Sequence, residues 1–234
     1  MQLIEVSVAG VRSAVITLEA GGTPLRIVLF PMVHLGAPGY YRAVTDRLAR
    51  CGCIVDEGIS RPPASVRALT LAYRLPGRRH RNRGLTSQDI DYAALPGIPV
   101  VRPDMSGQQF RRHWRGVPAR ERLAAWVLVP PVALVMALRG TRRTFGRYLS
   151  LDDLPSFQDE QVRQLAPGLT RAILDERDIL LTECLAGICR DHAAERMDVA
   201  VVWGADHMPA VTRELFRQFG YRPRSAEWLT VFDF

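Results

Sequence analysis

Four ionisable side chains follow four separate apolar runs of the chain, and their types suit catalysis at a shared site. They are His34, Glu57, Asp104 and His207. Two imidazoles and one or two carboxylates can hold a divalent transition metal while leaving positions open for water or substrate. Such a metal lowers the pKa of bound water, and a carboxylate can serve as the base. The pattern indicates a water-activating centre, with or without a divalent metal (Mn, Co or Zn).

The apolar runs before these residues are typical of buried strands. They cover residues 25–30, 53–55, 98–101 and 199–203. In open α/β sheets, ligands bind outside the carboxyl ends of the parallel strands, so neighbouring runs would bring the four side chains to one edge. Taken singly, each residue also reads as an ordinary loop residue. It is their recurrence after four runs that favours a site.

The remaining pattern predicts an α/β fold with a mostly parallel sheet. Alternating residues predict strands at 3–8 and 13–18, and a further strand is expected at 228–232. Helices are expected at 40–50, at 62–75 where Pro62-Pro63 opens the helix, at 168–192, and after His207 as far as Phe219. Strands that alternate with helices are typical of a single α/β domain, here residues 1–234.

Two segments of the chain share one order of features. Each has an apolar run, a turn, a histidine and a helix, and the motif VTxxLxR occurs at 44–50 and again at 211–217. This similarity predicts that the sheet is built from two related strand–turn–helix half-units.

Residues 61–147 form a basic segment that we expect to be a mainly helical excursion within the domain. They contain 17 arginines and 4 acidic residues, whereas the whole chain has a net charge of +7 and no lysine. Within the excursion, the apolar run 123–138 is interrupted by Pro130-Pro131, which predicts two short helices or one sharp kink. Because arginines flank it, residues 120–143 could lie on an anionic membrane surface; a buried helical pair that covers the site is the other interpretation.

Other features narrow the class of protein. The arginine-rich residues 78–83 have no interleaved aromatics, so a solvated or anion-facing loop is favoured over a nucleic-acid site. The spacing of Cys51, Cys53, Cys184 and Cys189 is not that of a zinc site, and buried free thiols are expected. The chain has no apolar window of spanning length and no secretory signal at its start, which predicts a cytoplasmic protein.

Several of these residues stand in motifs that resemble the Tiki/TraB superfamily, which includes GumN-like proteins, pheromone-shutdown proteins, erythromycin esterases and haem-binding ChaN-like proteins. The resemblance covers residues 25–58 and 168–234, with RPDMS at 102–106 as a middle anchor. It is carried by Gly204-x-x-His207 within VVWGADH, by FGY at 219–221, by Glu57, and by Glu-Arg-Asp at 176–178. The first histidine motif, PMVH at 31–34, has Pro31 where the family has glycine, which changes the turn and removes an amide donor.

The resemblance implies a role for each matching residue. His34 and His207 become the site histidines, Glu57 the acid, and Arg177 a binding group for a substrate carboxylate or phosphate, or a partner of Glu57. Asp104 is a further substrate-binding candidate. The Tiki branch hydrolyses peptides with a metal, and the erythromycin-esterase branch hydrolyses an ester with a histidine base. The expected activity is therefore hydrolysis of a peptide, ester or lactone bond, and the alternative is a non-catalytic binding or regulatory protein. His207 stands in a turn, so its replacement by alanine is expected to cost little packing.

Overall fold

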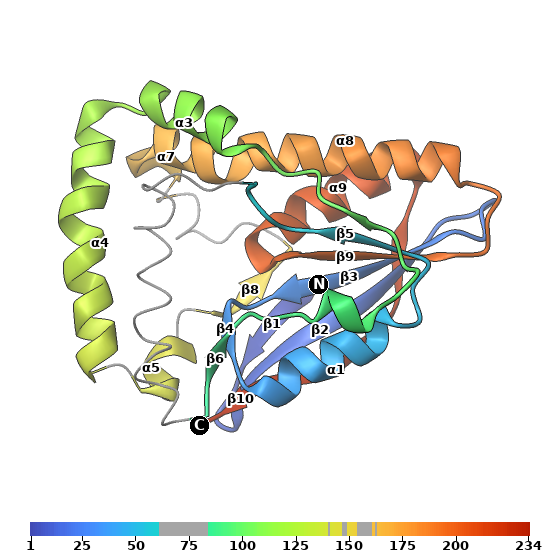
Figure 1. The fold of residues 1–234 in the computed structure, drawn as a ribbon, viewed down its shortest axis with the longest axis horizontal. Coiled ribbons are helices and arrows are strands. Elements are labelled where there is room, and N and C mark those ends of the chain that lie inside the picture. The colour runs from blue at the N-terminus through green and yellow to red at the C-terminus, as the bar shows by residue number, and fades with distance from the viewer. Residues whose placement is uncertain (61–83, 140, 147–148, 154–160, 162) are drawn as a thin grey trace.

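A mixed eight-stranded sheet forms the centre of the computed structural model, which describes residues 1–60, 84–139, 141–146, 149–153, 161 and 163–234 (Figure 1). The main path of the sheet runs β7-β5-β9-β3-β2-β1-β8, and β10 pairs with β2. The ten strands of the described chain, two of which form a separate pair, are β1 (Gln2–Val6), β2 (Gly10–Glu19), β3 (Arg26–Met32), β4 (Leu35–Gly36), β5 (Cys53–Asp56), β6 (Thr86–Ser87), β7 (Val100–Val101), β8 (Leu151–Asp152), β9 (Asp198–Gly204) and β10 (Arg222–Asp233).

Helices cover both faces of the sheet and extend beyond one end of it. The helical elements are α1 (Pro38–Leu48), η2 (Tyr92–Ala94), α3 (Gly107–Gly116), α4 (Ala119–Arg139), α5 (Arg142–Gly146), α7 (Pro167–Thr170), the π-helical turn η3 (Arg171–Asp175), α8 (Glu176–Asp191), η4 (Ala205–His207) and α9 (Met208–Phe219). The expected helices at 40–50, at 168–192 and after His207 are confirmed, whereas the expected helix at 62–75 and the basic loop at 78–83 lie outside the described residues.

The expectation of a mostly parallel sheet is wrong, because only part of the sheet is parallel. In the described sheet, β7, β5, β9 and β3 pair in parallel, while β1, β2, β8 and β10 enter it through antiparallel pairs. The reason is the length of the connections. Only a few residues separate β1 from β2 and β2 from β3, and a parallel connection needs a crossover of about a dozen residues or more.

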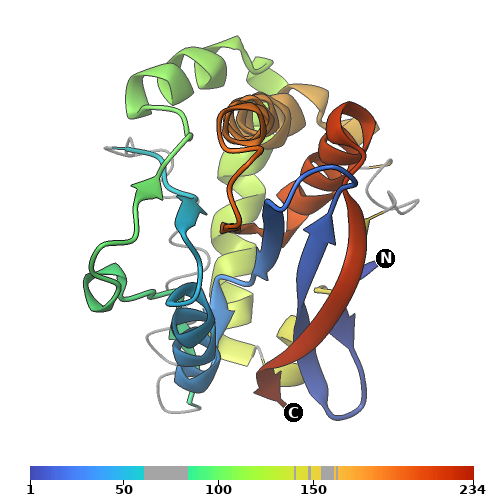
Figure 2. The ribbon, with the colours of Figure 1, turned by 90° about the vertical axis from the view of Figure 1, so that its right-hand side faces the viewer.

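Successive side chains of the parallel strands point to opposite faces of the sheet, which divides the core into two layers. In β9, Ala200 and Val202 pack on the α1 side, and Val199, Val201 and Trp203 pack on the side of α8 and α9. Figures 1 and 2 show α1 on one face of the sheet and α8 with α9 on the other. Every one of these five side chains is fully buried. The apolar run that predicts this strand is therefore the run of a strand covered on both faces.

The segments that share the VTxxLxR motif form neighbouring strands. β3 and β9 pair in parallel from Arg26 with Asp198 to Met32 with Gly204. Each strand leads to a histidine and then to a helix, but α1 and α9 pack into different core layers. In this register Gly204 lies beside Met32, and Pro31 is a residue of the strand rather than of the turn.

The middle of the chain differs from what the sequence pattern indicates. The described part of the expected excursion does contain α3, α4 and α5, but its β7 joins the main sheet beside β5. The apolar run 123–138 lies in one helix, α4, which contains Pro130 and Pro131 and is not two short helices.

The cysteines are free as expected, and all are buried except Cys184, which is partly exposed. Within the part of the chain that the structure describes, every helix is too short or too polar to span a bilayer.

The Pro31 carbonyl of β3 accepts hydrogen bonds from side chains. The β2–β3 ladder ends at the pair Ile16 and Leu29, and beyond it the buried Ser13 hydroxyl donates to the Pro31 carbonyl at 2.6 Å and the Tyr40 hydroxyl donates to it at 3.4 Å. Side-chain donors thus satisfy a carbonyl of β3 where strand pairing with β2 has stopped.

We expect Ser13→Ala to lower the free energy of unfolding by about 1–2 kcal/mol, because the change removes the shorter of two hydrogen bonds to a buried carbonyl. The measurement is urea denaturation followed by circular dichroism. Ser7→Ala is the matched control, since Ser7 accepts a bond from Ala9 in an exposed turn, and it should stay within about 0.5 kcal/mol of the parent. Equal stability of the two variants would contradict this account of Pro31.

Candidate functional site

The four strand-end residues lie on four adjacent parallel strands. His34 follows β3, Glu57 follows β5, Asp104 follows β7 and His207 follows β9, and these strands are consecutive in the sheet. A Cβ atom placed on Gly204 would lie 3.2 Å from Glu57 Oε2, 3.6 Å from His207 Cδ2 and 3.7 Å from His34 Nε2. The two histidines and the glutamate therefore meet around Gly204, at the edge that the sequence pattern indicated. A side chain at position 204 would crowd Glu57 and would touch both imidazoles at ordinary contact distance.

Arg177 of α8 is the centre of the hydrogen-bonded network at this edge. Its Nε donates to Asp104 Oδ1 at 2.9 Å, and its Nη2 donates to Asp104 Oδ2 at 2.6 Å and to Glu57 Oε1 at 2.7 Å. The residue is only 8% exposed. Burial lowers the pKa of an arginine, but the hydrogen bonds to Asp104 and the charge of Glu57 outweigh this and raise it, so the guanidinium stays charged.

Trp203 forms the floor beneath the guanidinium. The Arg177 Cζ atom lies 5.1 Å from the centroid of its ring, and the His207 ring meets it edge-on with centroids 5.1 Å apart. Trp203 is fully buried, and among the described residues its Nε1 has no hydrogen-bond partner. The aromatic face offers the cation a favourable surface where water is excluded.

Glu57 is an ionised anchor with both oxygens engaged. Besides the bond from Arg177, its Oε2 accepts from the Gly204 backbone N–H at 2.6 Å. Burial would raise the pKa of this carboxyl, but the charge of Arg177, followed by those of His34 and His207, lowers it to about 2. A general base works best with a pKa near the working pH. Glu57 is therefore better suited to positioning its neighbours and stabilising a nearby positive charge than to transferring a proton.

Asp104 is held just as firmly, in the interior. Its side chain has no exposed surface and accepts backbone bonds from Gly58 at 3.1 Å and Met105 at 2.8 Å, besides the two bonds from Arg177. In this structure the Asp104 side chain faces Arg177 rather than a substrate, and Arg177 pairs with Glu57, which is the second of the two roles that the resemblance implies for this arginine. The pair instead ties α8 to the ends of β5 and β7.

His207 is buried and oriented by an acidic residue. Its Nδ1 lies 2.6 Å from Asp178 Oδ1, and its Nε2 lies 3.3 Å from Arg177 Nη1. A guanidinium donates only, so Nε2 must be the acceptor and Nδ1 must carry the proton. At 3% exposure, His207 contradicts the expectation that its replacement costs little packing. Its turn packs down on Trp203 instead of facing solvent.

His34 is the exposed member of the site. Its Nδ1 lies 2.9 Å from Gln88 Oε1, and the Gln88 backbone N–H donates to the His34 carbonyl at 2.9 Å. The short β4–β6 pair, Leu35 with Ser87 and Gly36 with Thr86, fixes the two loops against each other. If Gln88 Oε1 accepts from Nδ1, the Nε2 atom near Gly204 carries the lone pair of the imidazole.

The donor set does not fit a divalent metal. Glu57 has both oxygens in hydrogen bonds, His207 has both nitrogens engaged, and a guanidinium lies where a cation would share these groups. Among the described residues, no group of three or more His, Cys, Asp or Glu could hold a metal ion. The metal that the sequence pattern implied at His34, Glu57 and His207 thus has no ligand set in the described chain, and we derive no step through it.

Sequence reasoning did not assign roles to Asp178, Trp203 and Gln88. Asp178 is the last residue of the Glu-Arg-Asp motif, and Trp203 stands immediately before the Gly204 turn, so both lie inside motifs that were already recognised. Their contacts with His207 and Arg177 join β9 to α8 and depend on how that helix lies on the sheet. Gln88 lies in a loop with no distinguishing local pattern.

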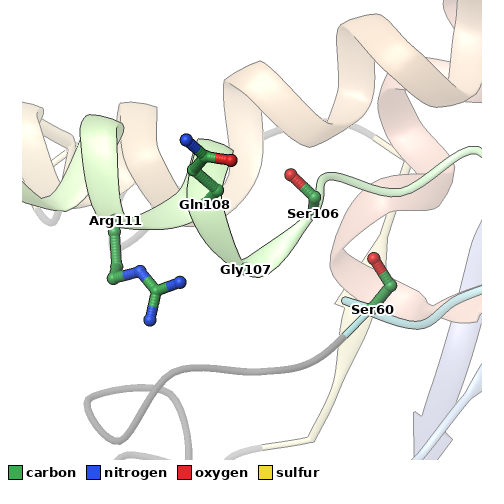
Figure 3. Close-up of a pocket in the computed structure, with 5 residues that line it drawn as sticks. All are labelled: Ser60, Ser106, Gly107, Gln108 and Arg111. Carbon is green, nitrogen blue, oxygen red and sulfur yellow. The ribbon is translucent and has the colours of Figure 1, made fainter.

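A polar cavity of about 320 Å³ lies just beyond the loops that carry Glu57 and Asp104 (Figure 3). It is lined by Ser60, Ser106, Gly107, Gln108 and Arg111, and Ser60 and Ser106 form an isolated parallel bridge. None of the hydrogen-bonded site residues lines it.

Compared with protein-family models, curated proteins and solved structures, the chain has no significant match.

We expect the stability contributed by Glu57 to depend on pH. Its pKa is about 2 in the folded protein and ordinarily 4.5, so its contribution is complete above about pH 5 and is lost as the pH falls toward 2. Glu57→Gln should be less stable than the parent at pH 7, and the gap should narrow by about 2 kcal/mol between pH 7 and pH 3. Urea denaturation across this range measures it.

Glu183→Gln is the control for this experiment. Glu183 is exposed on α8, the same helix as Arg177, and takes no part in the network. Its replacement should change stability by less than about 0.5 kcal/mol. A gap between Glu57→Gln and the parent that stays constant with pH would contradict the assignment of Glu57 as the anchored carboxylate.

Proposed function

We propose that the protein is a hydrolase that activates water for attack on an ester, lactone or peptide bond, as its resemblance to the Tiki/TraB superfamily implies. The observation that carries the proposal is the contrast between the two histidines. His34 is exposed, while His207, Arg177 and the side chain of Asp104 are buried. A group that meets substrate and water has to be reachable, and among these residues His34 is the reachable base.

In this proposal His34 takes the proton of the attacking water. With its Nδ1 proton directed at Gln88, the Nε2 lone pair accepts the proton while the water oxygen bonds to the carbonyl carbon. The imidazolium then returns that proton to the leaving oxygen or nitrogen as the scissile bond breaks. The Glu57 carboxylate, which remains ionised at neutral pH, favours the imidazolium formed at His34.

His207 and Arg177 act as positioning residues. Arg177 holds Glu57 beside Gly204, and the Asp178–His207 pair fixes the turn that follows β9. We therefore propose roles that differ from those implied by the resemblance alone: His34 is the base, and His207, Arg177 and Asp104 support it.

One observation favours the alternative of a non-catalytic binding or regulatory protein. Arg177 forms ion pairs with the carboxylates of Glu57 and Asp104, so the charged groups of the network pair with one another instead of facing a substrate. On that alternative the same scaffold binds a ligand near His34 without turnover.

Two further interpretations accompany the proposal. The parallel pairing of β3 with β9, and the histidine after each, support descent of the two strand–turn–helix segments from related half-units. Four free cysteines support a reducing compartment such as the cytoplasm.

We expect His34→Ala to lower kcat/KM by about 100-fold or more on a substrate found in a panel of esters, lactones and peptides, since it removes the base. Its free energy of unfolding should stay close to that of the parent, because His34 is exposed.

His207→Ala should lower both activity and stability, because it removes a buried ring and leaves Asp178 unpaired. Activity should survive a chelator.

His192→Ala is the matched control, as His192 is a partly exposed histidine at the end of α8 that bonds Glu195. It should retain full activity. Turnover that persists in His34→Ala would place the chemistry on other residues. A parent that binds panel members but hydrolyses none of them would favour the binding-protein alternative.

A further inference from the structure

Helix α4 exposes a continuous apolar stripe to solvent. Leu123 is 65% exposed, Trp126 45%, Val127 58% and Leu134 56%. These positions recur at spacings of three, four and seven residues, which places them on one face of a helix, and the exposed Pro130 lies between them on the same face. Leu128, which is 61% exposed, extends the apolar surface onto an adjoining face. The interpretation of this segment as a buried helical pair is therefore wrong.

The opposite face of α4 is attached to the rest of the protein near its N-terminal end. Glu121 is buried and accepts a bond from the Leu169 backbone N–H at 2.9 Å, and Ala125 packs against the cluster of Met105, Phe110 and Trp114. In Figure 1, α4 stands at one end of the molecule, away from the sheet. The protein thus holds the helix with its apolar stripe turned outward.

Arginines surround both ends of this stripe. Residues 105–150 contain nine arginines and one acidic residue, and that acid is the buried Glu121. At the N-terminal end, Arg111, Arg112, Arg115 and Arg120 are exposed, and beyond the C-terminal end Arg143 of α5 is exposed. An apolar stripe between two cationic ends matches the acyl chains and phosphates of an anionic bilayer.

The two prolines determine the depth at which such a helix can lie. Pro130 and Pro131 have no N–H, so the carbonyls of Trp126 and Val127 lack their usual donors within the helix. Such carbonyls are costly in hydrocarbon but are satisfied by water at the interface. The same charges argue against a second copy of the chain as the partner, because parallel or antiparallel pairing of two α4 helices brings arginine-rich ends together.

We propose that α4 lies on the surface of an anionic phospholipid bilayer, with Leu123, Trp126, Val127 and Leu134 inserted among the acyl chains and the flanking arginines facing lipid phosphates. This surface is separate from the His34 site and does not depend on the hydrolase proposal. It presents the protein to substrates or partners at a membrane surface.

Co-sedimentation of the full chain with vesicles tests this proposal. The parent should bind phosphatidylcholine vesicles that contain phosphatidylglycerol at least about tenfold more tightly than pure phosphatidylcholine vesicles, and added NaCl should weaken the binding. Val127→Asp should reduce binding by at least about tenfold, because it places a charge in the apolar stripe.

Phe216→Asp is the matched control, since Phe216 is 50% exposed on α9 and the substitution adds the same charge. It should bind as the parent does. Circular dichroism checks that both variants are folded, and the salt dependence of the parent tests the proposal without any variant. Three results would overturn it: no binding to the anionic vesicles, equal loss in both variants, or a dimer in solution that Val127→Asp dissociates.

Discussion

The positive charge of Arg177 is the constraint around which the rest of the site is arranged. An unpaired guanidinium at this depth would cost several kcal/mol in lost hydration, so the fold must supply anions and a polarisable surface at fixed positions. Asp104, Glu57 and the face of Trp203 supply them, and each comes from a different strand or its following loop. Satisfying one cation therefore fixes the position of α8 relative to β5, β7 and β9.

The same constraint separates the two histidines into different roles. His207 lies on the guanidinium side of the network, where Asp178 and Arg177 engage both of its nitrogens and water is excluded. His34 lies across Gly204, at the surface, and its orientation comes from Gln88 on a different loop. The imidazoles that follow two neighbouring parallel strands, two residues after Met32 and three after Gly204, are thus chemically different. Burial, which the sequence motif does not encode, makes the difference.

The parallel half of the fold was predictable because its signals are local. Runs of apolar residues identified β3, β5, β7 and β9, and a general rule of α/β sheets placed His34, Glu57, Asp104 and His207 at one edge. The antiparallel half was misjudged, although the short connection between β2 and β3 excludes a parallel arrangement. Strand β10 was only partly recognised, because its first six residues are exposed and carry no apolar alternation.

The roles within the site were less predictable than its location. Asp178 follows Arg177 directly, and only the placement of α8 on the sheet shows that one side chain reaches His207 and the other Glu57. The structure is also needed to show that the site does not suit a metal, since the residue types of His34, Glu57 and His207 alone form a plausible ligand set. The guanidinium of Arg177, 120 residues from Glu57 in the sequence, changes that interpretation.

A double-mutant cycle on Arg177 and Asp104 tests most directly whether this buried pair organises the site. Arg177→Met, Asp104→Asn and the double variant are compared with the parent by urea denaturation, beside the same cycle on the exposed pair Arg26 and Asp198, whose Nε and Oδ1 atoms lie 2.6 Å apart. The account predicts a coupling energy of about 2–4 kcal/mol for the buried pair and less than about 1 kcal/mol for the exposed pair. Additive effects at Arg177 and Asp104, or equal coupling in the two cycles, would contradict it.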